Sequence, residues 1–376
     1  MVVVGGGPAG SSCAGALRRQ GLDVLVLDRA RFPRHKVCAG WITPGIVEAL
    51  ALDLPDYGRG RTLQPILGFR TAVIGGRREV ETAYARPVSY GILRAEFDAY
   101  LLRRSGARVQ EGTALGSLAR DGGDWVINGE LRTPMLVGAG GHFCPVARWL
   151  GARGTEDVVV AAQEVEFRMD AGQRAACRVR PEVPELFFCA DLKGYGWCFR
   201  KGDVLNVGFG RADAEDFPRQ ARAFAGWLVA RGRVPADLPS RWLGHAYLLH
   251  DARRPRLVDD GVLLAGDAAG LAYAQSGEGI RPAVESGLMA AETIAAAAGD
   301  YRRARLERYR AELLRRFGRG GRASVPLPHG WIAAAGRALL GTRWFTRRVV
   351  VEDWFLHARV PAMAAPEGAA LARRPA

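Results

Sequence analysis

The chain begins with Met1-Val2-Val3-Val4-Gly5-Gly6-Gly7-Pro8-Ala9-Gly10, a short apolar run followed by closely spaced glycines. The β-branched run predicts a buried strand, and the small residues at 11–17 predict a helix. In such a turn Gly5 allows the tight bend, Gly7 lets the backbone approach a pyrophosphate, and Gly10 permits close packing of helix on strand. We therefore predict that this turn, including Pro8 and Ala9, binds a dinucleotide. The simpler alternative is a structural turn.

A second apolar run, Val24-Leu25-Val26-Leu27, ends in Asp28, eighteen residues after Gly10. An acidic residue at this point of a dinucleotide fold accepts hydrogen bonds from the adenosine ribose hydroxyls, and its charge disfavours a 2′-phosphate. We expect Asp28 and the adjacent Arg29 to contact the cofactor.

A second glycine-rich turn lies far along the chain. Gly261-Val262-Leu263-Leu264-Ala265 predicts another buried strand, which ends in Gly266-Asp267-Ala268-Ala269-Gly270. Gly277-Glu278-Gly279-Ile280 then opens a predicted helix through Ala298. NAD-binding domains lack this late segment, so the two turns together predict FAD. We expect Asp267 near the ribityl or pyrophosphate region and the helix N-terminus at the flavin pyrimidine edge, where its partial positive charge stabilises reduced flavin. The predicted contacts in this part of the chain are Gly266, Asp267, Gly277, Gly279 and Ile280.

Four internal segments, together with the two glycine-rich turns, are typical of one protein family. They are Lys36-Val37-Cys38-Ala39-Gly40, Arg94-Ala95-Glu96-Phe97-Asp98, Val137-Gly138-Ala139-Gly140-Gly141 with Arg148, and Tyr195-Gly196-Trp197-Cys198-Phe199. In this order, with both glycine-rich turns, the sequence resembles the FAD-dependent geranylgeranyl reductase family, within the para-hydroxybenzoate hydroxylase-like flavoprotein class. The resemblance spans roughly residues 1 to 300 and implies an FAD-dependent oxidoreductase.

The resemblance also implies roles for individual residues. The loop Lys36-Val37-Cys38-Ala39 would lie beside the isoalloxazine ring, and Cys38 is the candidate catalytic residue, because its thiol could donate a proton. A thiol that merely contacts the ring, or a buried structural cysteine, is the alternative. Arg94 would lie by the FAD phosphates; its alternative role is a surface salt bridge.

The aromatic segment is the candidate substrate-binding surface. Tyr195, Trp197 and Phe199 alternate along one predicted strand and therefore share a face, whereas Cys198 points the other way. In the family the matching aromatic residues lie against an isoprenoid chain near the flavin. An ordinary sheet core explains the same pattern.

Two departures from the family concern the source of electrons and the aromatic segment. Relatives usually read G-A-D-G where this chain has Gly138-Ala139-Gly140-Gly141, so a carboxylate expected near cofactor and reductant is missing. Arg200 replaces the proline that normally follows the aromatic segment. The reductant, NAD(P)H or a protein electron donor, therefore stays undetermined.

Composition narrows the protein class and its partners. The six cysteines form no C-x-x-C pair and no histidine spacing suggests a metal site, so we expect no metal. No uncharged apolar run reaches eighteen residues, which favours a cytoplasmic protein.

The C-terminal region is strongly basic. The net charge of the chain is +14, and residues 300–376 hold sixteen Arg against six acids. Without nucleic-acid-binding signatures, this region indicates either peripheral contact with anionic lipid headgroups or ordinary solvated helix faces.

The motifs predict an α/β fold in which a Rossmann-like FAD-binding domain (1–50, 86–157 and 251–300) is interleaved with an antiparallel β-sheet substrate-binding domain (51–85 and 158–250). A β-hairpin is expected around Gly75-Gly76. Residues 301–376 are predicted to form a C-terminal helical cap. Its aromatic residues could line an apolar tunnel, touch a membrane or fill a core; they are Trp331, Trp344, Phe345, Trp354 and Phe355.

The predicted function is reduction of carbon-carbon double bonds in a prenyl or lipid-like substrate, by hydride transfer from reduced flavin. An electron-donor protein is a further expected partner if NAD(P)H is not the reductant. The alternative is an FAD-dependent monooxygenase that hydroxylates or epoxidises an apolar or aromatic substrate through a flavin C4a-hydroperoxide. A prenyl-carrier protein without flavin is a non-enzymatic alternative, which the intact glycines and Asp267 oppose.

Overall fold

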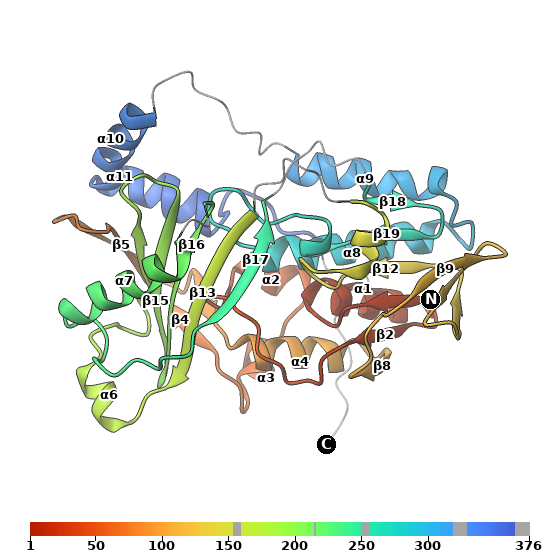
Figure 1. Cartoon of the computed structure of the whole chain (residues 1–376), viewed down its shortest axis with the longest axis horizontal. Helices are drawn as coiled ribbons and strands as arrows, with labels where there is room; N and C mark the ends of the chain where they lie inside the picture. Colours follow the sequence, from red (N-terminus) through yellow and green to blue (C-terminus); the bar gives the residue numbers. More distant parts are fainter. Residues whose placement is uncertain (153–158, 214–215, 250–255, 319–328, 365–376) are drawn as a thin grey trace.

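We describe the fold from a computed structural model of the chain, which covers residues 1–376 apart from 153–158, 214–215, 250–255, 319–328 and 365–376, and apart from the side chains of 329–332. In Figure 1 two large sheets lie side by side, with helices around each. Parts of the predicted C-terminal helical cap, residues 319–328 and 365–376, fall outside the described residues.

The first sheet is the predicted nucleotide-binding sheet. Its strand order is β18-β19-β12-β1-β2-β8, and all neighbouring pairs are parallel except β18 with β19. The strands are β1 (Val2–Val4), β2 (Leu25–Asp28), β8 (Arg108–Glu111), β12 (Leu136–Gly138), β18 (Val258–Asp259) and β19 (Val262–Leu264). The strands predicted from the runs at 1–4, 24–27 and 261–265 are confirmed. Their burial, complete apart from the half-buried Leu25, explains their apolar sequences.

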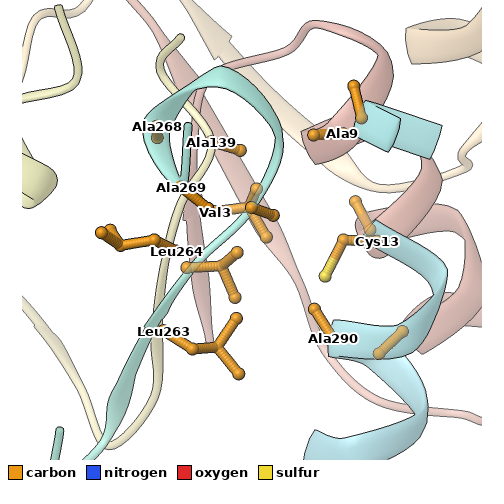
Figure 2. Close-up of a cluster of buried hydrophobic side chains, with 14 of the residues drawn as sticks. Val3, Ala9, Cys13, Ala139, Leu263, Leu264, Ala268, Ala269 and Ala290 are labelled. Atoms are coloured by element: carbon orange, nitrogen blue, oxygen red, sulfur yellow. The ribbon is translucent and has the colours of Figure 1, made fainter. Parts of the chain in front are cut away.

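Strand β12 brings the two distant turns together, because β1 pairs with one of its edges and β19 with the other. Helix α1 (Pro8–Arg19) packs against α8 (Ile280–Ala296) so closely that a Cβ on Gly287 would collide with the backbone of Ala9. Figure 2 shows the shared core, which includes Val3, Cys13 and Leu263. The predicted convergence of the two turns is confirmed.

The second sheet has seven strands in the order β17-β13-β16-β15-β14-β5-β6, antiparallel except for β14 with β5. The strands are β5 (Gly68–Val73), β6 (Glu79–Ala83), β13 (Val159–Arg168), β14 (Glu185–Phe188), β15 (Gly194–Lys201), β16 (Val204–Arg211) and β17 (Leu243–Leu248). The predicted hairpin is β5–β6. Cys198 packs into the core beneath α7 (Phe217–Ala230), and Trp197 and Phe199 join a different core, so the predicted alternation along β15 is confirmed.

Smaller elements surround these sheets. They are the sheet β3 (Trp41–Ile42), β7 (Ser89–Gly91) and β4 (Gln64–Ile66), the sheet β9 (Leu118–Asp121), β10 (Asp124–Ile127) and β11 (Leu131–Thr133), the helices α2 (Pro44–Ala49), α3 (Leu54–Gly58), α4 (Arg94–Arg104), α5 (Pro145–Trp149) and α6 (Ala171–Ala176), and a 3₁₀ turn at Gly266–Ala268.

The C-terminal helices divide between the two sheets. Helix α9 (Arg303–Phe317) packs its apolar side into the core of the first sheet, whereas the π-helix Thr346–Phe355 packs beside the second. Figure 1 places α10 (His329–Leu340) and α11 (Arg343–Phe345) near β5. Among the C-terminal aromatic residues, Phe355 is fully buried but Trp344 is 70% exposed, so Trp344 does not fill a core; the Trp331 side chain lies outside the described residues. Within the described part of the chain, no helix is long and apolar enough to span a membrane.

Candidate active site

A cavity of about 480 Å³ lies where the first sheet meets the second. This volume is within the range of about 300–1000 Å³ that is usual for cofactor and ligand sites. Its walls contain most of the predicted site residues, namely Gly5, Gly7, Pro8, Ala9, Asp28, Arg29, Lys36, Val37, Cys38, Ala39, Arg94, Tyr195, Trp197, Asp267, Gly277, Gly279 and Ile280.

The glycines of the first turn have different structural roles. A Cβ on Gly10 would collide with the Gly5 carbonyl, and one on Gly5, whose φ is +110°, would meet the backbone of Ala139. These two glycines therefore let the turn close. A Cβ on Gly7 would meet only the Arg34 guanidinium, at 3.3 Å. Gly7 leaves room on the cavity side, next to the N-terminus of α1, where an anion is favoured.

Asp28 holds the turn from the adjacent strand. Its Oδ2 accepts a hydrogen bond from the Gly6 N–H at 2.7 Å, and its Oδ1 accepts one from the Ala30 N–H at 2.8 Å. The carboxylate lies in the cavity wall and is 9% exposed. This position is compatible with the predicted ribose contact, which stays a prediction.

Arg94 is buried rather than in a surface salt bridge. Its guanidinium donates two hydrogen bonds to the Asp98 carboxylate, both at 2.9 Å, and Arg34 lies 3.2 Å from the same carboxylate. Burial alone would lower the pKa of Arg94, but pairing with Asp98 and with the Cys38 side chain outweighs burial and raises it. Two guanidinium groups share one carboxylate, so this wall keeps a net positive charge suited to a phosphate.

Lys36, His245 and Asp267 form a second charged group in the wall. Lys36 Nζ is 2.5 Å from His245 Nε2, and Asp267 Oδ2 lies 4.0 Å from Lys36 Nζ and 3.8 Å from His245 Nε2. Burial lowers the pKa of Lys36 to about 8 and also lowers the pKa of His245. Although burial raises the pKa of Asp267, the interactions with His245 and with the charge of Lys36 bring it to about 2. An ionised carboxylate therefore stands beside Lys36 and His245.

His245 and Tyr247 were not predicted from the sequence. Both line the cavity from β17. They stand two residues apart on a strand and therefore share a face. Period-two alternation along 243–248 was the available signal. It does not, however, tell which face of the strand meets a cavity.

The aromatic segment is only partly at the cavity. Tyr195 donates a hydrogen bond to the Ser276 carbonyl at 2.5 Å, and the Trp197 indole donates one to Asn206 Oδ1 at 2.7 Å. Phe199 is not in the cavity wall: it is 1% exposed and packs on Trp41, with ring centroids 5.0 Å apart. Trp41 covers Phe199 and takes its place in the wall, and the predicted contact of Phe199 with substrate stays untested.

Two predicted contact glycines support the cavity from behind. Gly10 and Gly266 are absent from the wall, and a Cβ on Gly266 would come within 3.0 Å of the Ala9 Cβ. Both glycines therefore allow close packing of the turns, and their predicted contacts with the cofactor stay predictions.

Glu278 is a buried acid in the cavity wall. Its Oε1 accepts a hydrogen bond from the Arg281 N–H at 2.7 Å, while Oε2 has no hydrogen-bond partner among the described residues and lies 3.8 Å from His357 Nε2. Burial raises the pKa of Glu278 to about 7. Burial and the charge of Arg281 lower the pKa of His357 to about 3, so the neutral imidazole is favoured near neutral pH, where Glu278 lies close to its titration midpoint.

The residues of the cavity fit FAD. The space at Gly7 would be filled by a side chain, the wall beside it is cationic, and the N-termini of α1 and α8 both lie at the cavity. Residues 1–319 match the family model described as "FAD binding domain". The chain belongs to this family and is an FAD-dependent oxidoreductase.

Within this class the chain belongs to the geranylgeranyl reductase family. It is 32% identical to the chloroplastic geranylgeranyl diphosphate reductase of Oryza sativa, over 84% of this chain and 72% of the relative. It is 30% identical to the menaquinone reductase of Mycobacterium tuberculosis (78% and 76% covered) and 26% identical to the digeranylgeranylglycerophospholipid reductase of Methanocaldococcus jannaschii (78% and 75%).

Solved structures share the fold. A geranylgeranyl bacteriochlorophyll reductase-like protein of Thermoplasma acidophilum aligns over 98% of this chain and 94% of its own, with a TM-score of 0.73 and 21% identity. The flavin-dependent halogenase CmlS aligns over 99% and 74%, with a TM-score of 0.69 and 20% identity. At these identities the likeness concerns the fold. The fold therefore does not separate reductases from halogenases, and the residues of the site must do so.

Proposed function

We propose that this enzyme reduces carbon-carbon double bonds in a prenyl or lipid-like substrate. The observation that carries the proposal is that Cys38, Tyr195 and Trp197 line the same cavity as the cofactor turns. Reduction of an isolated alkene requires a hydride for one carbon, a proton for the neighbouring carbon and a site that excludes water. The relatives named above support a prenyl substrate. When bound, FAD in its reduced form supplies the hydride.

The protein's own groups would orient the substrate and provide the proton. Tyr195 and Trp197 offer an aromatic wall against which an apolar chain can lie. We propose Cys38 as the proton donor: its S–H proton passes to one alkene carbon while the other carbon receives the hydride, and the resulting thiolate is reprotonated from solvent. The neighbouring Arg94 guanidinium, which pairs with the Cys38 side chain, would stabilise that thiolate.

The cofactor contacts follow from the same cavity. We propose that Gly5, Gly7, Pro8, Ala9 and the positive charge of Arg94 hold the pyrophosphate. Asp28 and Arg29 would hold the adenosine end, and the segments 36–39, 266–267 and 277–280 would hold the flavin end. We also propose the domain division given above, with 1–50, 86–157 and 251–300 forming the cofactor domain. The reductant is NAD(P)H or a protein electron donor.

The function is tested by anaerobic turnover. Purified protein is expected to be yellow, and after chemical reduction of its flavin it should saturate geranylgeranyl lipids, which mass spectrometry detects as additions of two hydrogens. Coloured protein that leaves the lipid unchanged would refute the proposal. Oxygen consumption that depends on an apolar or aromatic substrate would favour the monooxygenase alternative instead.

Replacing Cys38 with serine is expected to lower the rate of alkene reduction by about 10²–10⁴-fold, the usual contribution of a positioned proton donor. Flavin binding should persist, since serine is nearly isosteric with cysteine. Single-turnover oxidation of the reduced flavin by the lipid measures this step. A C38S rate equal to that of the unaltered enzyme would remove Cys38 from the chemistry.

We further propose that the protein is cytoplasmic and meets its lipid substrate through peripheral membrane contact. The exposed side chains of Leu339 and Trp344 lie near the exposed Arg343, a combination suited to anionic headgroups. Failure of the protein to sediment with anionic vesicles would refute this contact.

A further inference from the structure

A buried polar cluster lies directly behind the Cys38 loop. It comprises Glu164 and Glu166 on β13, Lys201 on β15 and Asn206 on β16. Glu164 is 1% exposed and Asn206 is fully buried. Buried charged and amide groups are costly unless they are hydrogen-bonded, so a cluster of four within a sheet calls for a role beyond packing.

Asn206 connects the two proposed reactive surfaces. Its Oδ1 accepts the hydrogen bond from the Trp197 indole at 2.7 Å. Its Nδ2 faces three acceptors: the Cys38 carbonyl at 3.3 Å, Glu164 Oε2 at 3.2 Å and Glu166 Oε2 at 3.0 Å. One amide therefore binds both the ring that faces the cavity and the peptide that carries the thiol.

Glu164 holds the other backbone polar group of Cys38. Its Oε2 accepts a hydrogen bond from the Cys38 N–H at 2.9 Å. The Cys38 residue is thus held at its N–H by Glu164 and at its carbonyl by Asn206. Backbone held at both polar groups has few alternative conformations, which fixes the direction of the side chain it carries.

Lys201 balances the charge of the cluster. Its Nζ lies 2.7 Å from Glu166 Oε2 and donates a hydrogen bond to the Ile92 carbonyl at 3.0 Å. Glu166 is therefore paired, and His35 stands 4.0 Å from its other oxygen. Glu164 lacks a cationic partner within salt-bridge distance among the described residues; burial and the charge of Glu166 raise its pKa to about 7.

We propose that Asn206, together with Glu164, is the positioning device of this cavity: it fixes the Cys38 peptide and the Trp197 ring in one mutual arrangement. The proposal rests on the proposed function in that Cys38 and Trp197 are taken to face cofactor and substrate. It predicts that disturbing Asn206 alters both walls at once, although Asn206 itself does not line the cavity.

The reactivity of the Cys38 thiol tests this arrangement directly. Cys38 is half-buried whereas the other five cysteines are buried, so a small alkylating reagent on native protein reports on Cys38, and peptide mass spectrometry identifies the site. Asn206→Asp keeps an acceptor for Trp197 but loses the Nδ2 donor. The carboxylate added in N206D disfavours the Cys38 thiolate, so the rate is predicted for the neutral variant: N206A should alkylate at Cys38 about tenfold faster, as the loss of one net hydrogen bond implies, and bind FAD more weakly.

Matched variants separate positioning from general destabilisation. Asn128→Asp makes the same chemical change at an exposed turn, and it should alkylate like the unaltered protein. Since N206D places another carboxylate beside Glu164 and Glu166, the neutral variant Asn206→Ala and the variant Glu164→Ala are measured in parallel. Glu164→Gln, which retains an oxygen for the Cys38 N–H, should restore slow alkylation relative to E164A.

The outcomes are distinct. Rates for N206A and E164A equal to that of N128D, in proteins with native thermal unfolding, would overturn the positioning role. If the unaltered enzyme fails to reduce geranylgeranyl lipids while alkylation still responds to N206A and E164A, the proposed function fails and the positioning role stands.

Discussion

Gly7→Val is expected to weaken FAD binding by about 100-fold or more while leaving the fold intact. A branched side chain at this point would occupy the space of the pyrophosphate, and each lost hydrogen bond to a charged group costs about 1.5–3 kcal/mol. The free protein should tolerate valine, because Gly7 has extended backbone angles (φ −75°, ψ −175°) and its Cβ would meet only a flexible guanidinium. Fluorescence titration with FAD measures the affinity.

Gly10→Val is the matched control for this prediction. Its Cβ would collide with the Gly5 carbonyl, so G10V should lose stability as well as flavin. The free energy of unfolding of G7V should stay within about 0.5 kcal/mol of the unaltered protein, as for substitutions that disturb no packing. A G7V protein that still holds one FAD per chain would show that the pyrophosphate lies elsewhere.

The contribution of Glu164 and Glu278 to the free energy of unfolding of the FAD-free protein is expected to fall as pH rises from about 5 to 8. Glu164 and Glu278 both have a pKa near 7 in the folded protein, against a reference value of 4.5. The folded state therefore binds protons more tightly. The stabilisation that these two carboxyl groups provide is fully present below about pH 4.5 and is lost as the pH rises through about 7. Each group contributes up to about 3 kcal/mol, since one pKa unit corresponds to about 1.4 kcal/mol.

The groups around Glu164 and Glu278 explain their raised pKa values. Glu164 faces Glu166, Lys201, Asn206 and the Cys38 N–H, while Glu278 faces Arg281, Glu285 and His357.

Glutamine variants test this pH dependence. Glu164→Gln and Glu278→Gln each remove one titrating group while keeping an amide oxygen in its place. Urea unfolding at about pH 5 and pH 8 should show a smaller difference for either variant than for the unaltered protein. Glu130→Gln, at an exposed position, provides the control. An unchanged pH dependence in both buried variants would contradict the raised pKa values.

Sequence reasoning worked best where local physics decides the outcome. Apolar β-branched runs became the strands β1, β2 and β19, and the glycine turns closed where a Cβ has no room. The site was harder to predict. Phe199 shares a face with Trp197, but the covering ring of Trp41 comes from residue 41, and no local pattern shows that contact. His245 and Asn206 were missed for the same reason: each acts through partners that are distant in sequence.

The position of β12 between β1 and β19 sets an order for synthesis on the ribosome. The first strand emerges early, yet its neighbour β12 arrives more than a hundred residues later, and β19 and the helix α8 that packs on α1 come later still. Contacts so distant along a polypeptide form slowly, and an incomplete parallel sheet exposes apolar edges that invite aggregation. A nascent chain arrested before residue 258 should therefore bind chaperones and hold no flavin, and cofactor loading becomes a late event in the life of each molecule.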